Sequence, residues 1–180
     1  MKLEQTADGS YTLYVPELDE HYHSVKGALT ESQHIFIEMG LKHSPVSEPH
    51  ILEIGLGTGL NAFLTLLSAE ETRRKVHYTG FERYPLAEET LKQLDYPRLI
   101  GKQHEEDYYA IHRAPWNTET EVSPWFTLHK IEDDFTRLFN RRKAAVPPFP
   151  YTISSTLMPS LPKNNPKCGN NLFSILYTRY

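Results

Sequence analysis

Short apolar runs alternate with amphipathic runs through the middle of the chain. Runs of strand length occupy residues 50–54, 76–81 and 125–131. Amphipathic runs at residues 60–68, 86–94 and 135–139 follow them and predict helices. Strands that alternate with helices are typical of parallel βαβ units, so the pattern predicts an α/β protein with a doubly wound sheet.

The N-terminal region has a different pattern. Residues 11–14 alternate as a strand, residues 21–24 predict a returning strand, and residues 27–39 predict a helix that stops at Gly40. A loop with two prolines spans residues 44–49. We therefore expect a small β element with one helix over residues 1–45, and a βαβ core over residues 46–143.

Residues 144–180 follow neither pattern. This segment contains repeated prolines and two Asn-Asn pairs, and no period of 2 or 3.6 runs through it before residues 172–177. Such a sequence offers little to a hydrophobic core, so we expect an aberrant, disordered tail.

Composition narrows the class of protein. The chain has 180 residues, 39% of them hydrophobic, and a net charge of −4. No apolar run approaches the roughly 20 residues of a membrane span, and the N-terminus has no signal core, so we expect a cytoplasmic protein with no membrane partner. The single Cys168 excludes an internal disulfide or a cysteine metal cluster. The acidic charge gives no general attraction to nucleic acid, so an RNA partner would need local patches.

The most informative motif joins the strand at residues 50–54 to the helix that follows. Glu53 lies near the strand end, and Gly55, Gly57 and Gly59 come at alternate positions directly after it. A strand, a glycine turn and a helix together let the polar body of a cofactor approach bare backbone. The spacing favours S-adenosylmethionine over a dinucleotide, for which Gly-x-Gly-x-x-Gly is typical. A tight packing turn is the other interpretation.

Acidic residues also end the next two predicted strands. Glu82 follows one strand, and Asp133 and Asp134 follow the other. Ligands of open parallel sheets bind beyond the carboxyl ends of the strands. A carboxylate at Glu82 could accept both ribose hydroxyls, and one at Asp133 or Asp134 could accept from the adenine amino group. Each acidic residue alone is more often a helix cap, but the three positions in order favour the cofactor interpretation.

Two other clusters have simpler interpretations. The segment from His21 to His23 could indicate a metal site, but no cysteine or Glu-x-x-His helix supports one, so we expect a partly exposed strand and no metal. The basic runs at residues 73–75 and 141–143 are more typical of solvated loops than of RNA contacts.

Three stretches resemble one family, the MnmD/MnmC-type methyltransferases that complete 5-methylaminomethyl-2-thiouridine at the wobble position of tRNA. The resemblance covers roughly residues 10–140. The glycine motif alone would indicate only a class I methyltransferase, and the first two stretches together make the resemblance specific. The stretches are Tyr22-His23-Ser24 with Gly27-Ala28, Glu31-Ser32 and His34-Ile35-Phe36-Ile37; residues 53–61; and residues 78–86.

The resemblance implies a class I S-adenosylmethionine-dependent, Rossmann-like fold that is incomplete at its C-terminal end. It implies tRNA as partner and the 5-aminomethyl nitrogen as methyl acceptor, without the flavin oxidase domain of bifunctional relatives. A non-catalytic binding module and an NAD-type oxidoreductase remain as alternatives. The implied cofactor residues are Glu53, Gly55, Gly57, Gly59 and Asn61 on the methionine side, Glu82 on the ribose, and Asp133 or Asp134 on the adenine side.

The family continues with a strand that ends in Asp-Ala-Phe-Ala-Pro, which this chain lacks in its own reading frame. Codons for residues 152–169, read from the third base of each, permit Asp-Ile-Ile-Tyr-Phe-Asp-Ala-Phe-Ala-Pro-Glu-Lys-Gln-Pro-Glu-Met-Trp. Met158 has the single codon ATG and Pro159 begins with CC, so the shifted codon between them must be GCC, which encodes alanine. We therefore interpret the tail as a frameshift product that begins between about residues 140 and 151, with a natural variable tail as the alternative.

The frameshift interpretation has a functional consequence. The family's aspartate would orient or deprotonate the substrate amine, and the junction of Leu157 and Met158 replaces its codon. We therefore name no catalytic residue in the chain as written, and we expect the chain to be inactive.

Overall fold

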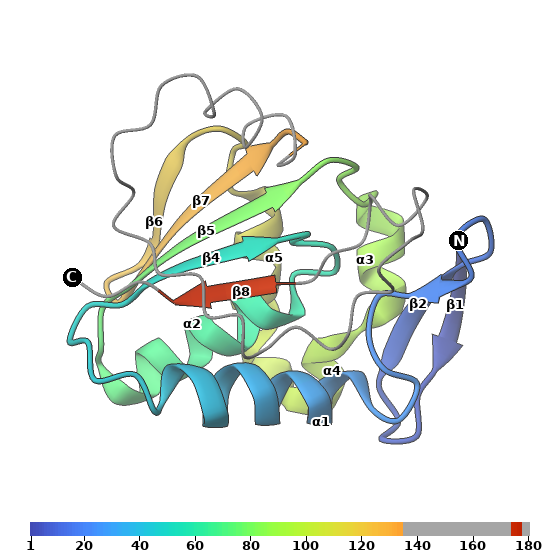
Figure 1. Ribbon diagram of the computed structural model, residues 1–180, viewed down its shortest axis with the longest axis horizontal. Coiled ribbons are helices and arrows are strands. Elements are labelled where there is room, and N and C mark those ends of the chain that lie inside the picture. Colours follow the sequence, from blue (N-terminus) through green and yellow to red (C-terminus); the bar gives the residue numbers. More distant parts are fainter. Residues whose placement is uncertain (135–173, 178–180) are drawn as a thin grey trace, which may run out of the picture.

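The computed structural model describes residues 1–134 and 174–177, and its centre is a five-stranded sheet (Figure 1). The strand order is β6-β7-β5-β4-β8. The three middle strands β4 (His50–Ile54), β5 (Val76–Glu82) and β7 (Phe126–Glu132) are parallel. The outer strands β6 (Glu119–Ser123) and β8 (Ser174–Tyr177) are antiparallel to their neighbours. The predicted α/β class with a parallel core is confirmed.

Helices connect the parallel strands. α2 (Leu60–Thr72) links β4 to β5. The second connection, from β5 to β7, contains α3 (Glu88–Leu94), α4 (Tyr96–Ile100), the short 3₁₀-helix η2 (Lys102–His104) and α5 (Glu105–Arg113). Both connections step across the sheet in the same direction, and right-handed crossovers then place α2 and α5 on the same face, where they contact each other.

Alternation along the strands builds the core between the sheet and these helices. Ile51, Val76, Tyr78, Phe126 and Leu128 are all buried, and the residues between them are more exposed. Nine of the first ten residues of α2 are buried as well, so this helix lies in the core and not on the surface. This alternation turns one face of each parallel strand toward the helices.

The N-terminal region forms a separate three-stranded antiparallel sheet of β1 (Lys2–Gln5), β2 (Tyr11–Val15) and β3 (Glu20–His21). α1 (Ala28–Ser32) follows and continues as the π-helix η1 (Gln33–Leu41), which packs on α2. The returning strand expected over residues 21–24 is present, but it is shorter and earlier than expected, because pairing with β2 ends at His21. The turn between β1 and β2 caps α1: the N–H groups of Ala28, Leu29 and Thr30 donate to the side chains of Thr6, Ser10 and Asp8 respectively.

Most of the predicted tail over residues 144–180, and the predicted helix at residues 135–139, lie outside the described residues. The described part of the tail is β8, in which Ser174 pairs with Ile54 and Tyr177 pairs with Ile51 of β4. The domain boundaries and the frameshift therefore stay predictions. Among the described helices, none is both long and apolar enough to cross a membrane.

Candidate cofactor site

The glycine turn lies between the end of β4 and the start of α2, as the sequence predicts. Gly55, Gly57 and Gly59 have φ angles of 85°, 52° and 70°, in the left-handed region that side chains with a Cβ disfavour. The N–H groups of Gly55 and Leu56 both donate to the carbonyl of Phe81, at 2.8 and 2.9 Å, which holds the turn against the end of β5. The three glycines therefore serve a backbone path that few other residues could follow.

Glu82 is fastened to this turn. The N–H of Gly57 donates to Glu82 Oε2 at 2.9 Å, and the N–H of Tyr84 donates to Oε1 at 2.8 Å. Each carboxylate oxygen can accept two hydrogen bonds, so both retain capacity for a further donor. The structure thus brings the predicted strand-end carboxylate and the glycine turn together through a direct bond.

The two aspartates after β7 lie beside the same strand ends. Glu132, just before them, pairs in register with Glu82 across β5 and β7. Asp134 forms an ion pair with Arg83, with 2.9 Å between Oδ2 and the guanidinium, and Asp133 accepts from the N–H of Asp134. All the predicted acidic positions therefore gather at the carboxyl edge of the parallel strands, where a ligand of this fold class would bind.

Glu53 and Asn61 sit deeper than the other predicted site residues. Glu53 is 1% exposed and accepts from Asn61 Nδ2 at 2.8 Å and from the Tyr78 hydroxyl at 2.7 Å. Burial raises the pKa of Glu53 to about 8, although the hydrogen bonds from Asn61 and Tyr78 oppose the shift. Asn61 Oδ1 is buried and has no hydrogen-bond partner among the described residues. Both residues lie under the turn, and their predicted contact with the methionine part stays a prediction.

Replacing Glu53 with glutamine should reduce the dependence of the free energy of unfolding on pH between pH 4.5 and 8. The folded-state pKa of about 8 lies above the ordinary 4.5, so the Glu53 contribution is complete below pH 4.5 and is lost as the pH rises through 8. Wild type should therefore lose about 1.4 kcal/mol per pH unit inside this window relative to the Glu53→Gln variant, which cannot ionise. Urea unfolding of both proteins from pH 5 to 8.5 measures the difference, and parallel curves would contradict a buried, neutral Glu53.

α5 supports the turn from below, a feature that sequence reasoning missed. The Tyr108 hydroxyl donates to the carbonyl of Thr58 at 3.0 Å. A Cβ added at Gly59 would lie 2.8 Å from the His112 ring. Burial, then the nearby Lys130, lowers the pKa of His112 to about 4, so this imidazole is neutral at physiological pH. Gly59 is therefore required both for its φ angle and for the close approach of α5.

Lys130 is a buried cation near the same edge. It is 1% exposed, and Nζ donates to the His112 carbonyl at 2.6 Å and lies 4.5 Å from the centre of the Trp116 ring. Burial lowers its pKa to about 8. The position falls inside a strand that reads as an alternating apolar run, and no local sequence signal distinguished Lys130 from a solvent-facing lysine.

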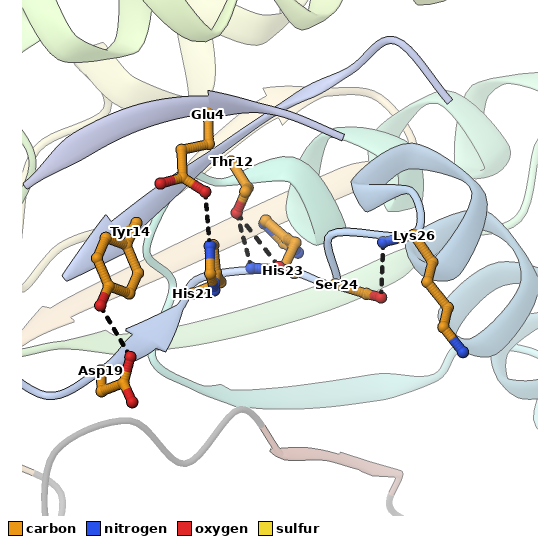
Figure 2. Close-up of polar contacts among 8 residues, drawn as sticks. All are labelled: Glu4, Thr12, Tyr14, Asp19, His21, His23, Ser24 and Lys26. Carbon is orange, nitrogen blue, oxygen red and sulfur yellow. Dashed lines mark hydrogen bonds and ion pairs between the residues drawn. The ribbon is translucent and has the colours of Figure 1, made fainter. Parts of the chain in front are cut away.

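The segment after β3 also reaches the site, and the predicted partial exposure holds for His21 and Tyr22 but not for His23. His23 is buried, at 9% exposure, and Nε2 lies 2.8 Å from Thr58 Oγ1. Figure 2 shows His23 beside Thr12, while His21 turns away to an ion pair with Glu4. Within the described part of the chain, no three His, Cys, Asp or Glu side chains are grouped to hold a metal ion.

Two hollows in the described surface lie away from the glycine turn. The larger, of about 780 Å³, lies between η1, α2 and the start of α5, and the smaller, of about 460 Å³, lies beside residues 44–48 and 73–75. Neither is lined by a predicted cofactor residue. The candidate site is defined here by the turn and the strand-end carboxylates.

Comparison with known proteins supports the resemblance that the sequence indicated. No protein-family model matches the chain. The chain is 36% identical over 84 residues to the "tRNA 5-methylaminomethyl-2-thiouridine biosynthesis bifunctional protein MnmC" of Idiomarina loihiensis, a match that covers 42% of this chain and 14% of that protein. It is 34% identical over 94 residues to the MnmC of Magnetococcus marinus, covering 48% of this chain and again 14% of the relative. The matched region is thus about one-seventh of the length of these curated relatives.

A solved structure matches more of the chain. MNMC2 from Aquifex aeolicus aligns with a TM-score of 0.59 and 26% identity, over 82% of this chain and 46% of that one. The chain resembles the MnmC proteins. This resemblance was expected from three sequence stretches, and it is confirmed, as is the Rossmann-like α/β fold.

Proposed function

We propose that the chain has the S-adenosylmethionine-binding fold of a tRNA methyltransferase that acts on the aminomethyl group of the wobble uridine. The MnmC relatives support the tRNA modification, because their name describes the biosynthesis of 5-methylaminomethyl-2-thiouridine. The methyl transfer step is our inference from the glycine turn and its carboxylate.

The observation that carries the proposal is the bond between Gly57 and Glu82. It joins a left-handed glycine turn at a helix N-terminus to a carboxylate at the end of the neighbouring parallel strand. A ligand with a polar chain at one end and a ribose at the other would meet both elements at once. S-adenosylmethionine has this form.

The residues present fit this ligand. The left-handed turn offers bare backbone, and the buried Asn61 Oδ1 lacks a donor among the described residues. In this proposal Glu53, Asn61 and the three glycines border the methionine part, Glu82 accepts from the ribose hydroxyls, and Asp133 or Asp134 accepts from the adenine side. When bound, S-adenosylmethionine supplies a methyl group on a positively charged sulfur.

The chain's own contribution to chemistry is alignment. Methyl transfer to nitrogen needs a neutral amine held in line with the carbon and sulfur, so positioning supplies much of the rate. We assign no catalytic residue within residues 1–134. We place the proton acceptor in the Asp-Ala-Phe-Ala-Pro segment that the alternative reading frame permits.

Replacing Glu82 with alanine tests the ribose role. The variant should bind S-adenosylmethionine about 1–3 kcal/mol more weakly than wild type, because the ribose hydroxyls lose a charged acceptor. Isothermal titration calorimetry measures the change. Glu132→Ala is the matched control, since Glu132 is aligned with Glu82 on the next strand but is exposed, and its affinity should equal that of wild type. Equal affinity of Glu82→Ala and wild type would refute the assignment.

A further inference from the structure

The N-terminal β element reaches the glycine turn through the buried side chain of His23. His23 follows β3, and its Nε2 lies 2.8 Å from the hydroxyl of Thr58, the residue between Gly57 and Gly59. Thr58 is 1% exposed. This contact spans 35 residues of sequence, and its loss would remove one hydrogen bond from a buried hydroxyl that also bonds the Tyr96 side chain.

His23 is itself held in place by the small sheet. Its backbone N–H donates to Thr12 Oγ1 at 2.9 Å, and its carbonyl accepts from the same hydroxyl at 3.4 Å. Figure 2 shows this double contact, with Thr12 on the strand that pairs with β3. These two hydrogen bonds anchor the backbone of His23 to the small sheet, and the sheet thereby places the imidazole beside the turn.

The turn is held from the opposite side by α5. The Tyr108 hydroxyl donates to the Thr58 carbonyl, and the His112 ring packs under Gly59. Thr58 is thus bonded through its side chain to His23 and to Tyr96, and through its backbone to α5. These contacts hold the turn from two sides.

The neighbouring residue extends the same segment toward the carboxylate. Burial raises the pKa of Tyr22 to about 12, and the charge of Glu82 adds to this rise, which places the phenol within electrostatic range of the carboxylate. Consecutive residues of the N-terminal segment therefore interact with both parts of the candidate site, His23 through its hydrogen bond to the turn and Tyr22 through the charge of Glu82.

We propose that His23 is a positioning residue of the cofactor site, which fixes the Gly55–Gly59 turn by its hydrogen bond to Thr58. The inference rests on the proposed function for the identity of the ligand. A turn that is already ordered loses less conformational freedom on binding, so the contact raises affinity for S-adenosylmethionine without touching it. The N-terminal element is then part of the binding apparatus and not an appendage to the core.

Calorimetric titration of the full chain with S-adenosylmethionine tests this role. His23→Leu and Thr58→Val should each bind about tenfold more weakly, a change equal to about one lost hydrogen bond. The double variant should be no weaker than Thr58→Val, because Thr58→Val already removes the bond to His23 together with the bond to Tyr96. His23→Gln keeps a polar nitrogen and should recover to within about threefold of wild type.

His21→Gln is the matched control. His21 lies two residues away in the same segment, but its partner is Glu4 and not the turn. The His21→Gln variant should therefore bind S-adenosylmethionine as tightly as wild type. Thermal melting of every variant identifies any that fail to fold. If His23→Leu fails to fold, Thr58→Val still tests the loss of the bond between His23 and Thr58.

Amide hydrogen exchange without ligand separates the two proposals. Exchange at Gly57 and Gly59 should be faster in His23→Leu and Thr58→Val than in wild type, whatever the ligand is. If wild type does not bind S-adenosylmethionine, the proposed function fails while the exchange still reports on the turn. If wild type binds, then unchanged affinity and exchange in both variants, or additive losses in the double variant, overturn the positioning role.

Discussion

A valine at position 57 should abolish detectable binding of S-adenosylmethionine while the domain stays folded. Gly57 has a φ of 52°, where a β-branched residue is strained by about 1–2 kcal/mol. Relief of this strain would move the Gly57 N–H away from Glu82 and cost a charge-assisted hydrogen bond of about 1.5–3 kcal/mol. The valine side chain would also stand where the proposed ligand needs bare backbone, and this steric exclusion should reduce binding below detection.

Gly9→Val is a matched control for this change. Gly9 also has a left-handed φ, of 84°, but it lies in the turn between β1 and β2, and an added Cβ would meet nothing within 4 Å. Gly9→Val should lower the melting temperature and leave binding unchanged. Calorimetry on both variants separates strain from ligand contact, and a Gly57→Val variant that binds like wild type would mean that the turn only serves packing.

Restoring the alternative reading frame should create methyl transfer, and the chain as written should show none. The written chain carries the turn and the acidic strand ends, but not the family's aspartate. A positioned acid or base contributes about 10²–10⁴-fold to rate, so the restored protein should exceed the written chain by at least this factor. The assay measures transfer to tRNA that carries 5-aminomethyl-2-thiouridine.

Sheet topology indicates where the restored segment would lie. The parallel strands are ordered β7-β5-β4, which corresponds to the order 3-2-1 of a doubly wound sheet, and the fourth parallel strand of that fold pairs with the first. In this protein the corresponding edge of β4 pairs with β8, which is antiparallel. The alternative strand, Asp-Ile-Ile-Tyr-Phe-Asp, placed parallel at this edge, would carry its last aspartate to the carboxyl end of the sheet, beside the glycine turn.

A restored protein with asparagine in place of that aspartate is the control, and it should return to the low rate of the written chain. Full activity of the written chain would contradict the prediction. The nucleotide sequence provides an independent check, because the shifted frame across residues 152–169 must encode the family string.

Local patterns predicted the elements that build the site. The strand at His50–Ile54 was predicted with its observed bounds, and the glycine spacing indicated the left-handed turn that the φ angles show. Glu82 was expected at a strand end, and its position there follows from the parallel order of the strands. These features depend on residues close together in sequence, which is why pattern reasoning could find them.

The missed features depend on contacts between distant segments. α5 is a mostly polar, acidic helix with two buried residues, so no apolar run in the sequence points to it, yet its Tyr108 and His112 support the turn. His23 reads as a polar strand residue, and its burial appears only when the N-terminal sheet packs against Thr58. The depth of Glu53 likewise depends on Tyr78 from the neighbouring strand.

Calorimetric titration of the unmodified chain with S-adenosylmethionine, in parallel with NAD, tests whether the glycine turn and the strand-end carboxylates form an S-adenosylmethionine site. The proposed site predicts saturable binding of S-adenosylmethionine with one molecule per chain, and no binding heat with NAD, because the turn follows the alternate glycine spacing and not the dinucleotide pattern. Binding of NAD, or no heat with S-adenosylmethionine from a folded chain, would contradict it.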